Sequence, residues 1–72
     1  MDNNEFLITL GIRIKKIRTE KQMSQQALAS LCNFEKPNMS RIERGKTNPT
    51  ILTLRIISQA LGVKLVDLLD HQ

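Results

Sequence analysis

Basic side chains are the groups in this sequence whose spacing points most clearly to a chemistry. Nine of the eleven Lys and Arg residues lie between positions 13 and 46, where three acidic residues accompany them, so this stretch carries a net charge of +6. Residues 1–12 contribute −2, and residues 47–72 sum to zero. A run of cations can be a solvated surface, or it can bind a polyanion when a scaffold aims the charges in one direction.

The residue types that usually perform catalysis are poorly represented. His71, the single histidine, lies next to the C-terminus, and Cys32, the single cysteine, falls at the apolar end of a predicted helix, where a core position is expected. Asp67 and Asp70 lie one helical turn apart, but the sequence gives them no histidine or third ligand. There is no phosphate-cradling glycine loop. We therefore expect no catalytic residue, no metal site and no cofactor.

The composition favours one small helical domain spanning residues 1–72. Hydrophobic residues make up 40% of the chain, yet Phe6 and Phe34 are its whole aromatic content, so the core must be aliphatic. A lone cysteine suggests a reducing compartment, and the polar start MDNNEF does not resemble a signal peptide. Apolar runs are too short to span a membrane. We expect a cytoplasmic protein.

Apolar periodicity predicts the first helix over residues 5–21, with Gly11 as a tolerated weak point. The apolar stripe recurs at spacings of three and four, at Leu7, Leu10, Ile14 and Ile17. The remaining surface of this helix is expected to carry the basic residues Arg13, Lys15, Lys16 and Arg18.

Ser24 is a good N-cap for a second helix that carries Ala27, Leu28 and Leu31 and ends near Cys32. Asn33 tolerates the left-handed conformation of a sharp turn. A third helix is predicted over residues 35–44, because Pro37 is acceptable in a first turn and Gly45 can end the helix. Its buried face is expected to hold Met39 and Ile42.

A loop over residues 46–49 leads to Thr50, which is expected to cap a fourth helix that Gly62 closes. The inward residues of that helix are predicted to be Ile51, Leu54, Ile57 and Leu61. A last short helix is predicted over residues 64–69. Five helices with short connections, and no convincing strand, indicate an all-α, compact five-helix bundle.

The helices at 24–32 and 35–44, joined by a short turn, form a helix-turn-helix arrangement, in which the second helix lies in the major groove of DNA. Ala29 offers the small side chain that lets two helices approach steeply. The apolar residues expected to hold the pair together are Leu28, Phe34, Met39 and Ile42.

Four segments, in order and at matching spacing, carry a family resemblance: LGIRIKKIR, MSQQALA, MSRIERGKTNPT and TLRIISQALGV. From about Leu10 to Leu69 the chain resembles the Cro/C1-type (XRE-like) helix-turn-helix regulators of bacteria and phage. The resemblance implies a lambda-repressor-like DNA-binding domain, with the helix-turn-helix at about 24–44, and not an enzyme.

The resemblance also implies roles for individual residues. Positions that point at base edges are matched by Lys36, Pro37 and Arg41, with Asn38 and Ser40 beside them. Positions that contact the DNA backbone are matched by Gln25, Arg44, Lys46 and Asn48. Gln25 is also expected to brace the recognition helix, and Arg18 and Glu43 match an ion pair between the first and third helices. Chemically, Arg41 can donate two parallel hydrogen bonds to guanine O6 and N7.

Three positions depart from the family pattern. Glu35 stands where Ser or Thr usually caps the recognition helix, and although its carboxylate suits a helix N-terminus, it would repel a nearby phosphate. Asn33 replaces the commoner glycine of the turn. Ala27 stands where an acid would complete a capping box with Ser24.

The sequence therefore predicts a transcriptional regulator that binds double-stranded DNA as a homodimer on a two-fold-related operator. Spare apolar residues near the end of the chain, Leu65, Val66 and Leu69, with parts of the fourth helix, could form the dimer surface or belong to the core. An antitoxin or protein-interaction module of the same fold, binding a partner protein, is the alternative.

Overall fold

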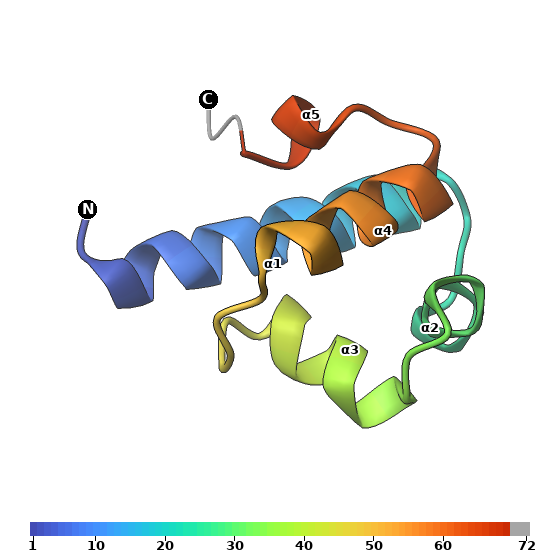
Figure 1. Cartoon of the computed structure of the whole chain (residues 1–72), viewed down its shortest axis with the longest axis horizontal. Helices are drawn as coiled ribbons and strands as arrows, with labels where there is room; N and C mark the ends of the chain where they lie inside the picture. Colours follow the sequence, from blue (N-terminus) through green and yellow to red (C-terminus); the bar gives the residue numbers. More distant parts are fainter. Residues whose placement is uncertain (70–72) are drawn as a thin grey trace.

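The chain folds into helices whose bounds follow its capping residues closely. A computed structural model describes residues 1–69, and within them there are five α-helices and no strand (Figure 1). The helices are α1 (Asn3–Glu20), α2 (Gln25–Cys32), α3 (Lys36–Glu43), α4 (Ile51–Leu61) and α5 (Leu65–Leu69). The predicted all-α, five-helix class is confirmed. Asp70 and His71, considered above as candidates for catalysis, lie outside the described residues.

Each of the first, second and fourth helices begins where a short polar side chain accepts a backbone N–H. Ser24 Oγ accepts from Ala27 N at 3.0 Å, and Thr50 Oγ1 accepts from Thr53 N at 3.1 Å, as the sequence predicts. Helix α1 begins two residues earlier than expected, because Asp2 Oδ1 accepts from Glu5 N at 2.8 Å. An acidic N-cap serves a helix start as well as a hydroxyl does.

Four helices end in the same way, with one residue in the left-handed conformation. The φ angles are 59° at Gln22, 59° at Asn33, 71° at Gly45 and 72° at Gly62. After each of them the next residue donates its N–H to a carbonyl five residues earlier, as in Phe34 N to Ala29 O at 2.8 Å. Asn33, Gly45 and Gly62 were expected at these ends, but Gln22 carries no sequence signal for a positive φ.

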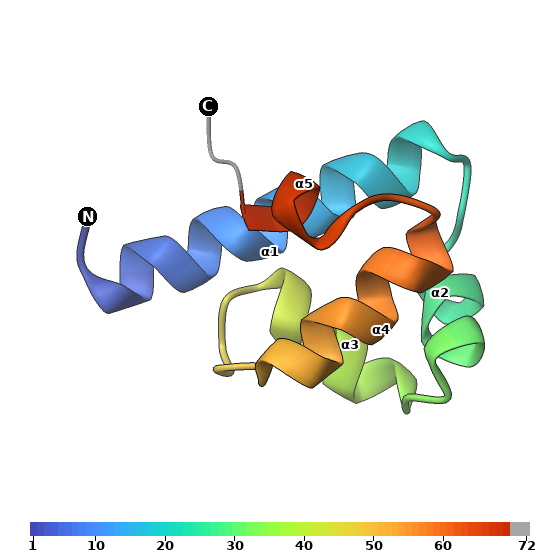
Figure 2. The ribbon, with the colours of Figure 1, turned by 45° about the horizontal axis from the view of Figure 1, so that its top comes forward.

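Helix α1 passes behind α4 in the view of Figure 1 and packs against α3 and α5, while α2 packs against α3 and α4 (Figures 1 and 2). Helix α4 also packs against α5. Apolar side chains from every helix meet in one core, which contains Leu10, Ile14, Ile17, Leu28, Ala29, Cys32, Met39, Ile42, Leu54, Ile57, Leu61 and Leu68. This core fixes the orientation of α3 about its own axis.

Gly11 is a close-packing position and not the weak point that periodicity suggests. A Cβ on Gly11 would lie 2.4 Å from the carbonyl oxygen of Glu43 and 2.6 Å from that of Ile42. Across the same contact, a Cβ on Gly45 would lie 2.6 Å from the Cα of Ile8. The two glycines therefore let α1 and the end of α3 approach backbone to backbone.

Two expectations about side-chain placement were wrong. Ile51 was expected in the core but is 59% exposed, because it is the first residue of α4 and lies at the edge of the bundle. Arg18 was expected on the surface of α1 by its position, yet it is buried at 7% exposure by the ion pair described below. Among residues 1–69, no helix combines the length and apolarity needed to cross a membrane.

Candidate nucleic-acid interface

Helix α3 has one face in the core and the opposite face in solvent. Met39 is fully buried and Ile42 is 6% exposed, so these two residues anchor the inner face as predicted. The outer face carries Lys36, Pro37, Asn38, Arg41 and Arg44, all exposed, and Ser40 lies half-buried at its edge. The base-contacting residues predicted from the sequence thus share one accessible surface.

The first turn of α3 is set by Pro37 rather than by a capping side chain. Glu35 occupies the N-cap position with extended backbone, but its carboxylate makes no cap hydrogen bond. Pro37 supplies a fixed φ suited to a helix and lacks an N–H that would be unpaired there. Consequently the Glu35 carboxylate is an exposed negative charge beside Lys36.

A buried ion pair ties α3 to α1 and α2. Arg18 donates from Nε to Glu43 Oε2 at 2.7 Å and from Nη2 to Glu43 Oε1 at 3.0 Å, which is a bidentate geometry. Its Nη1 donates to the carbonyl oxygen of Met23 at 2.8 Å. Gln25 Nε2 donates to Glu43 Oε1 at 3.0 Å. One carboxylate at the end of α3 therefore receives donors from two other helices, and the Gln25 bond supplies the brace that the resemblance implies.

The ion pair also shapes the charge of the exposed surface. Because Arg18 neutralises Glu43 inside the bundle, this ion pair adds no net charge to the protein surface. Along residues 35–46 the exposed ionic side chains are Glu35 and the four cations Lys36, Arg41, Arg44 and Lys46. This part of the described chain is thus a basic surface centred on α3.

The basic residues of α1 do not all extend this surface. Arg13 is half-buried, and its Nε donates to the carbonyl oxygen of Asp67 at 2.9 Å, which ties α1 to α5. Lys15 and Lys16 are exposed on α1 itself. The nine Lys and Arg residues between positions 13 and 46 therefore do not form one surface. Four of them belong to α3 and the loop after it.

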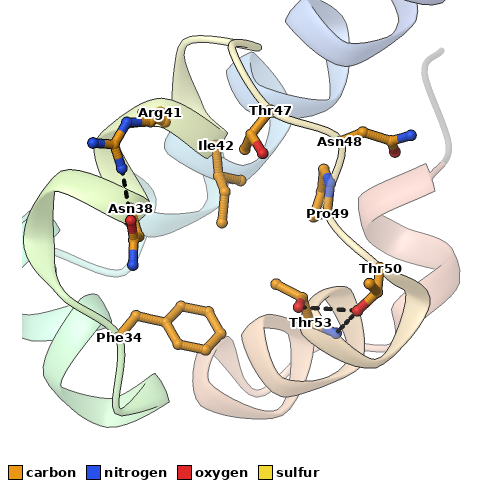
Figure 3. Close-up of a pocket in the computed structure, with 9 residues that line it drawn as sticks. All are labelled: Phe34, Asn38, Arg41, Ile42, Thr47, Asn48, Pro49, Thr50 and Thr53. Carbon is orange, nitrogen blue, oxygen red and sulfur yellow. Dashed lines mark hydrogen bonds between the residues drawn. The ribbon is translucent and has the colours of Figure 1, made fainter.

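The outer face of α3 borders a hollow of about 300 Å³ between this helix, the following loop and the start of α4 (Figure 3). It is lined by Phe34, Asn38, Arg41, Ile42, Thr47, Asn48, Pro49, Thr50 and Thr53. At its α3 edge Arg41 Nη1 donates to Asn38 Oδ1 at 2.7 Å. The sequence does not predict that the threonines and Phe34 line this hollow. No local pattern indicates that the loop over residues 46–49 lies beside α3.

The predicted backbone-contacting residues flank the same surface. Arg44 is exposed at the end of α3, and its Nε donates to the Ser40 carbonyl at 3.3 Å, so the side chain runs back along its own helix. Lys46 and Asn48 are exposed in the loop that leads to α4. Gln25 is half-buried, at the start of α2.

Cys32, another of the candidate chemical groups, lies apart from this surface. Cys32 is buried in the core, and burial raises the pKa of its thiol above the usual range. Among the described residues no group of three or more His, Cys, Asp or Glu side chains is placed to hold a metal ion.

Comparisons with known proteins agree on one family and one fold. The family model described as Helix-turn-helix matches residues 14–68. Control protein C.BamHI of Bacillus amyloliquefaciens is 40% identical over 68 residues, which cover 93% of this chain and 84% of that protein. The restriction-modification controller protein C.AhdI of Aeromonas hydrophila superposes with a TM-score of 0.84 at 29% identity, covering 86% of this chain and 94% of that one.

A third similar protein was solved with nucleic acid present. The master regulator for biofilm formation SinR, in complex with DNA, superposes with a TM-score of 0.79 at 42% identity, over 85% of this chain and 98% of that one. An HTH-type transcriptional regulator SinR of Bacillus subtilis is 41% identical to this chain over 64 residues, which cover 88% of this chain and 58% of that protein.

Proposed function

This chain belongs to the Helix-turn-helix family of Cro/C1-type transcriptional regulators, and from that membership we propose that it binds double-stranded DNA sequence-specifically and regulates transcription in the cytoplasm. The observation that carries the proposal is the orientation of α3. Met39 and Ile42 are held in the core, so the cationic face of the helix is turned outward. An exposed helix of this kind fits the width of the major groove.

Residues on the outer face of α3 are proposed to read the bases. Arg41 is suited to guanine, Lys36 to guanine or a phosphate, and Pro37 to apolar contact with a thymine methyl. Asn38 and Ser40 lie beside them on the same surface. The proposed phosphate contacts are Gln25, Arg44, Lys46 and Asn48, which would set the position of the helix without reading sequence.

A homodimer on a two-fold-related operator completes the proposal. One recognition helix contacts only a few base pairs, so two copies are needed for useful specificity, with half-sites centred about 10 bp apart. Leu65 and Leu69 are partly buried against the core. On the last two helices, the exposed large apolar residues are instead Val66 on α5, with Ile51, Leu52 and Ile56 on α4, each at least 40% exposed. We therefore place the dimer surface on α4 with Val66.

Selection of bound duplexes from a random pool tests the proposal. We expect a selected motif with two related half-sites, and an affinity that falls steeply as salt is raised, because bound cations displace counterions from the phosphates. A chain that enriches no sequence over the starting pool would contradict the proposed function. The names of the relatives described above point to regulators and controllers, and none points to a toxin partner.

A further inference from the structure

Asn38 and Arg41 stand three residues apart on α3 and share its outer face, where both side chains are exposed. Their side chains are joined by the hydrogen bond from Arg41 Nη1 to Asn38 Oδ1 at 2.7 Å (Figure 3). Asn38 and Arg41, which the proposed function places side by side, are thus linked directly by a hydrogen bond.

The chemistry of this bond fixes the orientation of the amide. A guanidinium carries N–H donors and no acceptor, so the amide oxygen of Asn38 must face Arg41 and its Nδ2 must turn away. Reading adenine requires an asparagine to accept from N6 with Oδ1 while Nδ2 donates to N7. Because Oδ1 already accepts from Arg41, it can accept from adenine N6 only with its second lone pair and in an orientation that Arg41 sets, so Asn38 is poorly prepared to read a base independently of Arg41.

The same bond leaves Arg41 able to contact guanine. It uses Nη1, so the edge formed by Nε and Nη2 is not the one that Asn38 takes. Two parallel N–H groups on that edge match the spacing of guanine O6 and N7. A surface arginine with a mobile side chain loses conformational entropy when it binds. An arginine whose side chain is already held by a neighbour loses less.

We infer that Asn38 is a positioning residue for Arg41, and that the two act as a single guanine-reading unit. This inference rests on the proposed function and deepens it. It predicts that the contribution of Asn38 appears at the base pair read by Arg41 and not at a base pair of its own.

A double-mutant cycle on DNA tests the inference. The guanine read by Arg41 is first located as the base pair at which Arg41→Ala loses discrimination in the selected operator. Dissociation constants are then measured for the wild type, Asn38→Ala, Arg41→Ala and the double variant. We expect Asn38→Ala to weaken binding and guanine discrimination about 3- to 10-fold, which is the scale of ordering one long side chain. In the Arg41→Ala background the same change should alter affinity less than about twofold.

Asn4→Ala supplies the matched control. Asn4 is also an exposed helical asparagine, so its replacement carries the same gain in helix propensity without touching Arg41. An equal effect of Asn38→Ala with and without Arg41, or a loss of discrimination at a different base pair, would overturn the inference while leaving the proposed function intact. Failure of the wild type to select any operator would instead refute the proposed function.

Discussion

At the scale of single residues, Arg18 shows how a charge can serve structure instead of binding. Its guanidinium satisfies the Glu43 carboxylate and the Met23 carbonyl at the junction of α1, α2 and α3. Composition alone counts Arg18 among the cations of a basic stretch. Its burial could be foreseen from the family resemblance but not from charge or periodicity, since the partner lies 25 positions along the chain.

Removing Arg18 should therefore destabilise the fold. Arg18→Met leaves Glu43 buried without its cation, and we expect the free energy of unfolding to fall by about 3–5 kcal/mol. Lys15→Met, on the exposed surface of the same helix, should change it by less than about 0.5 kcal/mol. Urea unfolding at pH 7 measures both. Similar stabilities for the two variants would refute the structural role of the pair.

Arg41 and Arg44 should differ in what they contribute to DNA binding. Arg41→Ala should reduce discrimination among operators by about 1–3 kcal/mol at one base pair, because a bidentate contact to guanine is lost. Arg44→Ala should weaken binding to all sequences similarly and lower the salt dependence by about one phosphate contact per subunit. Titrations of selected and scrambled duplexes at several salt concentrations separate the two effects. Equal losses on every duplex for both variants would contradict these assignments.

At the scale of elements, helix ends were easier to foresee than helix contacts. Caps such as Ser24 and Thr50 act over three residues, so the sequence displays them, and the predicted bounds agree with the structure to within two residues. The sequence does not reveal the role of Gly11, because that role depends on α3, which lies more than twenty residues further along the chain. The hollow beside α3 was missed for the same reason.

Gly11→Ala tests the close contact between α1 and α3. In an ordinary helix interior this change stabilises by about 1 kcal/mol, but here the new Cβ would meet two backbone carbonyls that cannot move aside cheaply. We expect a loss of more than about 2 kcal/mol, on the scale of overpacked cores. Thermal and urea unfolding are suitable measurements.

Gly62→Ala is the control for this prediction. Its Cβ would meet nothing within 4 Å, so the substitution carries only the strain of a φ of 72°. That strain is about 1–2 kcal/mol for a residue other than glycine. A Gly11→Ala variant as stable as the wild type would show that the two helices do not pack this closely.

At the scale of the whole molecule, the basic face of α3 and the apolar face of α4 have different proposed partners, DNA and a second copy. Periodicity predicted most of the inner residues of both helices, as Met39 and Leu54 show, with Ile51 as the exception. The sequence does not predict which apolar residues of α4 and α5 stay exposed to solvent. Their exposure depends on which residues of α5 pack against the core. Val66 is exposed although Leu68 is fully buried two residues later.

Leu52→Glu should separate the proposed dimer. Leu52 is 64% exposed on α4, and burying a leucine on both sides of a two-fold interface is worth about 3–6 kcal/mol, so the dimer dissociation constant should rise by more than about 100-fold. Sedimentation equilibrium measures this change. Ile12→Glu makes a matching change at a residue that is 60% exposed on α1, and it should leave the dimer intact. If Ile12→Glu dissociates the dimer and Leu52→Glu does not, the interface lies on α1 and not on α4.

Chemical modification of the selected operator tests most directly whether α3 enters the major groove. Methylation at guanine N7 places a group in the major groove, whereas methylation at adenine N3 places one in the minor groove. We predict that N7 methylation within each half-site blocks binding, and that the block at one guanine disappears in Arg41→Ala. Interference confined to adenine N3, with N7 methylation tolerated throughout both half-sites, would contradict the account.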